Sequence, residues 1–399
     1  MRSVAVTGIG VISALGANRE SFWKALAAGE SGIRPMELIA PGTVRFPNAA
    51  EARDYNIADH FDEKEAGFLD RFAQFAAVAA REAVLDSGID WTDELRASTA
   101  IVTGSSTGGQ TSEDESFRDY YERKQIRFSP FTIPKAMSNA GASRISYEQG
   151  VTGPVYTVST ACSSANHAIG QAFWMVRNGA VELAICGGSE APFSPGMLKA
   201  WEGMRVVSPD TCRPFSLDRK GLILGEGAGM LVLEPLERAR ARGAHIYGEI
   251  AGFGMSSDAH HLTQPLADGA ARAMRAALAD ASASPEVVGY INAHGTGTLA
   301  NDPTETEAIR AVFNPSKLLV SSTKSMHGHA LGAAGAIEAA ATLLALSRGV
   351  IPPTANFLAP DPACDLDVVP NTARPVEVEW ALSNSFAFGG LNAVLAFRR

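Results

Sequence analysis

The stretch Thr157-Val-Ser-Thr-Ala-Cys-Ser-Ser-Ala-Asn166 indicates both how the chain folds and where its chemistry lies. Its first residues belong to an apolar run that predicts a strand at 155–158, and its last residues open a predicted helix at 163–179. Cys162 is therefore expected at a helix N-terminus, where the dipole favours a thiolate by about 0.3–1 kcal/mol. Its small neighbours leave room for a substrate. Cys162 is thus a candidate nucleophile, with a buried structural cysteine as the alternative.

Strands and helices alternate along the rest of the chain, which is the pattern of an α/β fold. Short apolar runs rich in β-branched residues predict the strands, and Ala-rich runs that end near glycine predict the helices. The predicted strands are 4–7, 99–103, 155–158, 183–186, 229–233, 246–252, 288–293, 377–383 and 392–397, and the predicted helices are 68–87, 163–179, 235–242, 269–281 and 331–347.

The order of these elements indicates a diverged duplication. A helix at 68–87 followed by a strand at 99–103 parallels a helix at 269–281 followed by a strand at 288–293. The helix at 163–179 likewise parallels the helix that begins at 331. We therefore predict two similar halves, residues 1–243 and 244–399, that pack as one body with a site at their junction.

The composition indicates a globular protein and excludes several classes of function. Of the 399 residues, 46% are hydrophobic and 19% are charged, which supports a large core rather than disorder. The net charge of −9 argues against a general nucleic-acid binder. The four cysteines are widely spaced without a CxxC pair, so neither a thiolate zinc site nor a disulfide scaffold is predicted. We expect a cytoplasmic location.

No segment predicts a membrane span. Residues 151–176 lack acidic and basic side chains, but Pro154 and many polar residues interrupt them. The N-terminal apolar run resembles a signal peptide, but Gly8 and Gly10 break it, and we interpret it as a strand and turn. The run from Gly8 to Ser13 lacks the third glycine of a dinucleotide fingerprint, so a nicotinamide site is not predicted.

The second half of the chain carries the remaining candidate residues. His294 follows a predicted strand, where α/β folds place ligand-binding side chains, although a loop histidine is the alternative. Lys324 and His329 stand just before an Ala-rich helix. Glu338 lies inside that apolar helix, and a buried acid needs a partner such as Lys324 or a cation. A cysteine combined with histidines from the other half indicates covalent thioester chemistry.

Five motifs, in this order, resemble the signatures of β-ketoacyl-[acyl carrier protein] synthases of the I/II type, the condensing enzymes of fatty-acid and polyketide synthesis. The resemblance covers essentially the whole chain. The motifs are Thr160-Ala-Cys-Ser-Ser164, His294-Gly-Thr-Gly-Thr298, Ser321-Ser-Thr-Lys324, Gly328-His-Ala-Leu-Gly-Ala-Ala-Gly335 and Asn384-Ser-Phe-Ala-Phe-Gly-Gly390.

The resemblance implies a thiolase fold, in which two similar halves form a five-layered α/β/α/β/α body. It implies a decarboxylative Claisen condensation of malonyl-carrier protein with an acyl chain held on Cys162. His294 and His329 match the histidines that stabilise the enolate, and Lys324 matches a lysine that positions the site. The backbone N–H groups of Cys162 and Phe388 match an oxyanion hole.

The resemblance also implies the roles of several further residues. Substrates arrive on the phosphopantetheine arm of acyl carrier protein, no separate cofactor is expected, and a homodimer is usual, with a heterodimer as the alternative. The implied residues are Thr296, Thr298 and Thr263 on the pantetheine arm; Phe386 and Phe388 at a gate, which the sequence alone leaves open as a simple β-turn; Thr107 on the acyl pocket; and Glu338, Asn292, Ser383 and Asn384 in a buried network that in some relatives holds a monovalent cation.

Several positions depart from the family pattern. His327 stands where a threonine is usual, Ala387 replaces a glycine between two phenylalanines, and Leu391 replaces a threonine. Residues 298–302 resemble polyketide-type and nodulation-type synthases more than those of general fatty-acid synthesis. The main hypothesis is nevertheless a synthase of fatty-acid elongation, because all five family motifs are present. The alternative is a ketosynthase of a specialised polyketide or polyene pathway that needs a partner subunit.

Other classes fit less well. A catalytically silent partner subunit typically lacks the nucleophile, which this chain retains as Cys162. A thiolase or a starter synthase that uses coenzyme A would carry a different set of catalytic residues. Docking of an acidic carrier protein on an acidic chain requires a local basic patch, for which Arg71, Lys124 and Arg127 are candidates.

Overall fold

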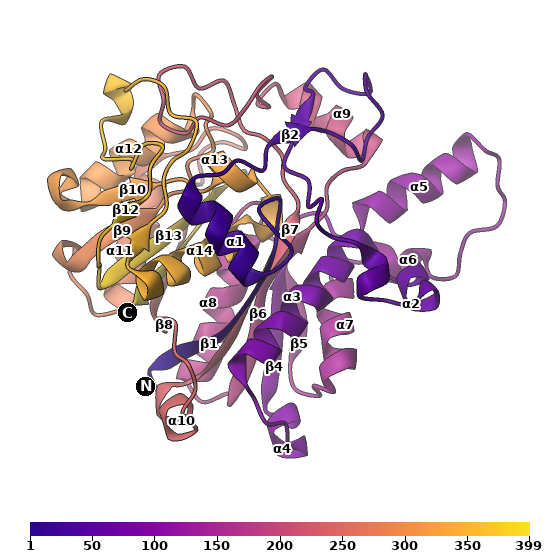
Figure 1. Cartoon of the computed structure of the whole chain (residues 1–399), viewed down its shortest axis with the longest axis horizontal. Helices are drawn as coiled ribbons and strands as arrows, with labels where there is room; N and C mark the ends of the chain where they lie inside the picture. Colours follow the sequence, from indigo (N-terminus) through magenta and orange to yellow (C-terminus); the bar gives the residue numbers. More distant parts are fainter.

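Ten strands form the central layers of the molecule, and helices cover and separate them (Figure 1). The structure is a computed structural model that describes all residues from 1 to 399. The strands hydrogen-bond in the order β10-β9-β13-β14-β8-β1-β7-β6-β4-β5. Only Val4–Val6 of β1 pair with β8, so a short ladder joins two five-stranded sheets.

The two sheets repeat one topology, which confirms the predicted duplication. In the first, β4 lies parallel to β5 and β6, and β7 runs antiparallel to β6 and β1. In the second, β9 lies parallel to β10 and β13, and β14 runs antiparallel to β13 and β8. The first contains β1 (Val4–Ile12), β4 (Thr99–Gly104), β5 (Val155–Val158), β6 (Leu183–Glu190) and β7 (Gly227–Pro235), and the second contains β8 (Gly248–Ser257), β9 (Val288–Asn292), β10 (Leu319–Ser321), β13 (Trp380–Ala387) and β14 (Leu391–Arg398).

Helices complete a five-layered α/β/α/β/α body, as predicted. The middle layer is α8 (Ser164–Arg177) with α14 (Ala334–Arg348), which contact each other and strands of both sheets. In Figure 1 they lie between the indigo-to-magenta half and the orange-to-yellow half. The outer layers contain α3 (Arg71–Ser87) and α7 (Ala140–Gln149) on one side, and α11 (Ala267–Asp280) and α12 (Asn301–Val312) on the other.

Shorter elements connect these layers and surround the active-site region. The helices among them are α1 (Arg19–Ala28), α2 (Glu63–Gly67), α4 (Asp93–Ala97), α5 (Gln110–Tyr121), α6 (Thr132–Ala136), α9 (Pro195–Met204), α10 (Leu236–Ala241) and α13 (Lys324–His327), with a 3₁₀ turn, η4, at Leu331–Ala333. Two small antiparallel sheets of two strands each pair β2 (Arg34–Pro35) with β3 (Asn48–Ala49) and β11 (Val350–Ile351) with β12 (Arg374–Pro375).

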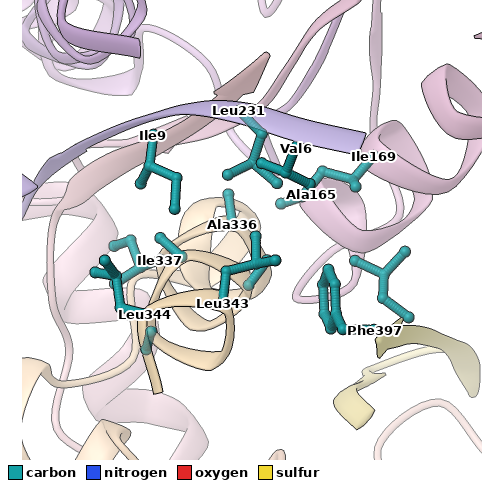
Figure 2. Packing of buried hydrophobic residues seen from close by; sticks show 14 of the residues in the cluster. Val6, Ile9, Ala165, Ile169, Leu231, Ala336, Ile337, Leu343, Leu344 and Phe397 are labelled. Atoms are coloured by element: carbon teal, nitrogen blue, oxygen red, sulfur yellow. The ribbon is translucent and has the colours of Figure 1, made fainter. Parts of the chain in front are cut away.

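The largest core surrounds the middle helices. Figure 2 shows Ile337 and Leu343 of α14 facing Ile9 and Leu231 of the first sheet, with Phe397 of the second sheet beside them. Residues Leu331–Arg348 are long and apolar enough to cross a membrane by composition, but 89% of this window is buried inside the fold. This segment is therefore the core helix on which both sheets pack.

Several strands are longer than predicted because glycines continue them. The prediction ended the first strand at Thr7 and placed a turn at Gly8 and Gly10, but β1 runs on to Ile12. A Cβ atom on Gly10 would lie 1.9 Å from the carbonyl oxygen of Ala79 on α3. The glycines therefore let a helix approach the strand closely, and they do not mark its end.

Candidate active site

Cys162 lies in the turn between β5 and α8, where its side chain is buried. Ala161 has a φ of 52°, a left-handed conformation that is uncommon for a residue with a Cβ atom. Hydroxyl groups hold this turn: Ser163 Oγ donates to the Thr160 carbonyl at 2.9 Å, and Ser164 Oγ donates to the Ala161 carbonyl at 2.6 Å. The strained turn fixes the cysteine at the entrance to the middle helix.

Two histidines from the second half face this cysteine. His329 Nε2 lies 3.1 Å from Cys162 Sγ. The rings of His294 and His329 are 5.5 Å apart and nearly perpendicular at 87°. His294 follows β9 and His329 follows α13, so three separate elements meet at one point.

Burial and one cation set the charge of these groups. Burial, together with the nearby Lys324 ammonium, holds the pKa of His294 and His329 well below the usual range, so both imidazoles are neutral at pH 7. Burial raises the pKa of the Cys162 thiol to about 11, although Lys324 and the backbone N–H groups of Phe388 and Cys162 act to lower it. The expected advantage of a helix N-terminus is thus smaller than the cost of desolvation, and the resting group is a thiol.

Lys324 and Glu338 form a fully buried ion pair behind the histidines, as the sequence indicated for Glu338. Lys324 Nζ donates to Glu338 Oε1. Burial raises the pKa of Glu338 to about 7 in spite of the lysine. Removing either partner would leave an uncompensated buried charge, so the pair acts as one unit.

The residues of the expected network surround this pair. Asn292 Nδ2 donates to the Glu338 carbonyl at 3.3 Å, and Asn384 Nδ2 donates to Glu305 Oε1 at 3.1 Å. Glu338 Oε2, Ser383 Oγ and Asn384 Oδ1 are buried without any hydrogen-bond partner. Three orphaned oxygens in one region are unusual, because buried polar atoms are normally satisfied.

A glycine turn carries the two phenylalanines of the expected gate. Phe386 belongs to β13, and Phe388 follows it, before Gly389 and Gly390 with φ angles of 85° and 71°. The Phe388 ring stacks on Trp201 of α9, with centroids 6.2 Å apart. Phe388 is therefore held by an aromatic contact rather than by the buried core.

Two cavities meet at Cys162 and Phe388. The first is an entrance lined by both histidines and by the three threonines expected on the pantetheine arm, Thr263, Thr296 and Thr298. The second has a volume of about 480 Å³ and is mostly apolar. Its walls include Thr107, the residue that the family resemblance implies for the acyl pocket, together with Trp201 and Leu331.

Sequence reasoning missed several groups beside the site. Glu305 accepts hydrogen bonds from the backbone N–H groups of His294 and Gly295 at 2.8 and 2.7 Å. Trp201 and Glu190 were also missed. These residues lie on α12, α9 and β6, and their partners are distant in sequence, so no local pattern reveals these contacts.

Of the three basic residues predicted to bind a carrier protein, Arg71 does not fit that role. Arg71 forms a bidentate ion pair with the buried Glu226, at 2.7 and 2.8 Å, and is not free to bind a partner.

The unusual His327 does not add a charge beside His329. Burial lowers the pKa of His327 to about 3, and its Nε2 atom lies 3.0 Å from Thr323 Oγ1.

The site joins a buried cysteine to two neutral histidines and a lysine within a duplicated five-layered fold. These features define a condensing enzyme of thiolase fold. Family models agree with this class: the beta-ketoacyl synthase N-terminal domain matches residues 1–239, and its C-terminal domain matches residues 247–358.

Known proteins resemble the chain over its full length. Nodulation protein E of Rhizobium sp. (strain N33) is 47% identical and aligns over 100% of this chain and 99% of its own. 3-oxoacyl-[acyl-carrier-protein] synthase 2 of Staphylococcus aureus (strain N315) is 40% identical, and the alignment covers 100% of this chain and 98% of the relative. The solved structure of the ishigamide ketosynthase/chain length factor superposes with a TM-score of 0.95 at 38% identity. The superposition covers 100% of this chain and 99% of the solved chain.

The chain belongs to the β-ketoacyl synthase family, and it is a condensing acyltransferase.

Proposed function

We propose that this chain is a 3-oxoacyl-[acyl carrier protein] synthase that extends an acyl chain held on Cys162. The observation that carries the proposal is the 3.1 Å approach of His329 Nε2 to Cys162 Sγ, where the entrance and the apolar cavity meet. A nucleophile and groups that stabilise an oxyanion thus face one point.

The first proposed step transfers the acyl group. Cys162 Sγ attacks the thioester carbonyl, and the bond from that carbon to the pantetheine sulfur breaks. The proton of the Cys162 thiol ends on the departing pantetheine sulfur. The N–H groups of Cys162 and Phe388, which lie near Sγ and lower the pKa of its thiol, would stabilise the tetrahedral oxyanion.

The second proposed step forms the carbon–carbon bond. The malonyl group loses CO₂, and the electron pair of the broken bond forms an enolate whose oxygen accepts hydrogen bonds from neutral His294 and His329. The enolate carbon attacks the acyl carbonyl, and the bond from that carbon to Cys162 Sγ breaks. Cys162 leaves as a thiolate and takes up one proton from water, which restores the resting thiol. Burial and the charge of Lys324 together keep both histidines neutral, so each ring can donate the N–H that it carries.

The cavities supply the binding elements of the proposal. Thr263, Thr296 and Thr298 line the entrance and would hold the pantetheine arm, and Phe386 with Phe388 would gate the passage. Thr107 lies on the apolar cavity that would hold the acyl chain. The release of CO₂ drives the reaction, so the proposal includes no separate cofactor.

A monovalent cation fits the buried network. Glu338 Oε2, Ser383 Oγ and Asn384 Oδ1 have no partner, and oxygen atoms are the ligands that alkali cations prefer. These three residues would hold the ion together with Asn292. The ion would supply a fixed positive charge that compensates these buried oxygen atoms beside Lys324.

The proposed partners are acyl carrier protein and a second chain of the same fold. Strand β5 ends one edge of the sheet without a neighbour, and its four residues are only half-buried. The segment that contains α5 and α6 exposes Ile126 and Ile133, and α7 links it to β5. An open edge beside exposed apolar side chains favours an isologous dimer.

The proposed location is the cytoplasm, which the four free cysteines fit.

A specialised pathway is the second candidate function. The relative at 47% identity is a nodulation protein, and the structural neighbour is a ketosynthase/chain length factor. In this case the second chain would be a non-identical partner of the same fold.

Mass spectrometry of the intact protein, mixed with a panel of acyl-carrier-protein thioesters, tests the proposal. A covalent acyl adduct that Cys162→Ala abolishes is the expected result, and the best-loaded chain identifies the pathway. No adduct with straight saturated chains would overturn fatty-acid elongation. Loading of an unsaturated or polyketide chain, or loading only after a partner chain is added, would favour the second candidate.

A further inference from the structure

Glu190 is a buried carboxylate beside the catalytic site that the proposed reaction leaves unused. It ends β6 and is fully buried. It accepts hydrogen bonds from donors on three consecutive residues, Ser105, Ser106 and Thr107, and a further one from the Gly332 N–H. A buried charge requires such compensation, and here hydroxyl and backbone groups supply it instead of a cation.

These hydrogen bonds determine which atoms the acyl cavity exposes. Ser106 and Thr107 line that cavity, yet their hydroxyl groups and N–H groups all point at Glu190, with distances of 2.7 Å for Ser106 N and 2.9 Å for Thr107 Oγ1. The polar atoms of this wall are thereby turned away from the cavity. A wall made of serine and threonine therefore presents its carbon atoms to an acyl chain.

Glu190 also connects this wall to a second one. Its Oε2 atom accepts from the Gly332 N–H at 3.1 Å, and Leu331, the preceding residue, lines the same cavity. The two segments lie close together: a Cβ atom on Gly332 would lie 2.6 Å from Glu190 Oε2 and 2.4 Å from the Ser106 nitrogen. One carboxylate thus fixes the spacing between two walls of the cavity.

We propose that Glu190 is a specificity-determining positioning residue, which keeps the acyl cavity apolar and sets its width for long acyl chains. The inference rests on the proposed function, because it assumes that the chain on Cys162 occupies this cavity. Glu190 touches no substrate in this account and acts through the loop at 105–107 and through the start of η4.

The test compares loading of Cys162 by long and short acyl groups in the Glu190→Gln protein. An amide directs N–H groups at donors that need an acceptor, so the loop at 105–107 should turn its polar atoms toward the cavity. We expect the ratio of octanoyl to acetyl loading rates to fall about tenfold, since hydrogen bonds to a charged acceptor are among the strong ones. Stopped reactions with each acyl-carrier-protein thioester, read by intact mass, give both rates.

A matched control separates this effect from general destabilisation. Glu51 is also buried and accepts backbone N–H groups, from Glu37 and Leu38 at 2.9 Å, but it lies on neither cavity. Glu51→Gln should leave the ratio of octanoyl to acetyl loading unchanged. A global loss of stability would reduce both rates together in either variant.

A second variant keeps the inference testable if Glu190→Gln does not fold. Ser105 Oγ donates to Glu190 at 3.0 Å, but Ser105 does not line the acyl cavity, so Ser105→Ala loosens the loop without changing the wall. We expect a smaller fall of the same ratio. An unchanged ratio in the folded variants would overturn the inference, whereas a wild-type chain that loads neither acyl group would overturn the proposed function instead.

Discussion

Cys162 is a thiol at rest because desolvation outweighs every group that favours its anion. Lys324 and two backbone N–H groups lower its pKa, yet burial raises that pKa to about 11. In the proposed mechanism the thiolate therefore forms only when the substrate arrives, and the proposed oxyanion hole stabilises charge only as the reaction proceeds.

The pH dependence of Cys162 alkylation tests this assignment. With a thiol pKa near 11, the rate of reaction with iodoacetamide should rise about tenfold per pH unit from pH 7 to pH 10, because only the thiolate reacts. Peptide mass spectrometry measures the rate at this one cysteine, and Cys162→Ala identifies the background. A plateau below pH 8 would show that the helix N-terminus holds a thiolate at rest.

Asp302 provides a second titrating residue, close to the entrance cavity. Burial raises its pKa to about 6, although the N–H groups of Phe215 and Gly297 donate to it at 2.8 and 3.1 Å. The folded-state pKa thus exceeds the unfolded value of 3.8, so the native state binds the proton more tightly. Protonated Asp302 therefore stabilises the folded state. This contribution to the free energy of unfolding is complete below pH 3.8 and is lost as the pH rises through 6.

Asp302→Asn should remove this part of the pH dependence. A difference of about two pKa units corresponds to about 3 kcal/mol, so between pH 4 and pH 6.5 the free energy of unfolding of the wild type should fall by up to about 3 kcal/mol relative to the variant. Urea unfolding at both pH values measures the difference. Parallel pH profiles for the two proteins would contradict the assignment.

At the level of elements, glycines decide how closely helices approach strands. The Cβ position of Gly10 on β1 lies 1.9 Å from Ala79 O on α3, and that of Gly104 on β4 lies 2.5 Å from Ala165 N on α8. Neither position tolerates a side chain without movement of a helix. The close approach of α8 to β4 also holds Cys162 in place at the start of α8.

Gly10→Ala should destabilise the protein by about 1–3 kcal/mol, because the added methyl group meets backbone atoms that cannot move away. Gly203→Ala is the matched control: Gly203 lies in α9 with no atom within 4 Å of its Cβ position. That change should instead stabilise by about 0.5–1 kcal/mol through helix propensity. Thermal unfolding distinguishes the two, and equal melting temperatures would contradict the close packing.

The sequence predicted nine of the ten central strands and the residues that gather at the site, but only five of the fourteen α-helices. Periodic apolar runs identify helices and strands, and the family motifs point to Cys162, His294 and His329 directly. Strand ends were predicted poorly because β1 continues through glycines that resemble a turn. Contacts between distant loops, such as those of Glu190 with the segment at 105–107, leave no local pattern and needed the fold.

At the scale of the whole molecule, neither half is sufficient for the chemistry. The first half carries Cys162, and the second carries His294, Lys324 and His329. Helices α8 and α14 pack against each other between the sheets, so the junction that buries the core also assembles the site. The division of the chain at residue 243 stays a prediction.

The open edge at β5 predicts a dimer of about twice the 41.9 kDa of one chain. Replacing both Ile126, which is 89% exposed, and Ile133, which is 70% exposed, by Asp should yield a monomer because charges would enter the buried interface. Leu85→Asp on α3, at 83% exposure, is the matched control and should remain dimeric. Light scattering after size exclusion gives the masses. A wild-type monomer would instead favour a non-identical partner.

The central claim is that one site joins an acyl group on Cys162 to the carbanion left by a malonyl thioester. The most direct measurement adds malonyl-carrier protein to the acylated enzyme and follows the masses of both proteins. We predict that the acyl adduct disappears while a 3-oxoacyl-carrier protein, extended by two carbons, forms with release of CO₂, and that His294→Ala retains the adduct without extension. An adduct that only hydrolyses in the wild type, or extension that persists in Cys162→Ala, would contradict the account.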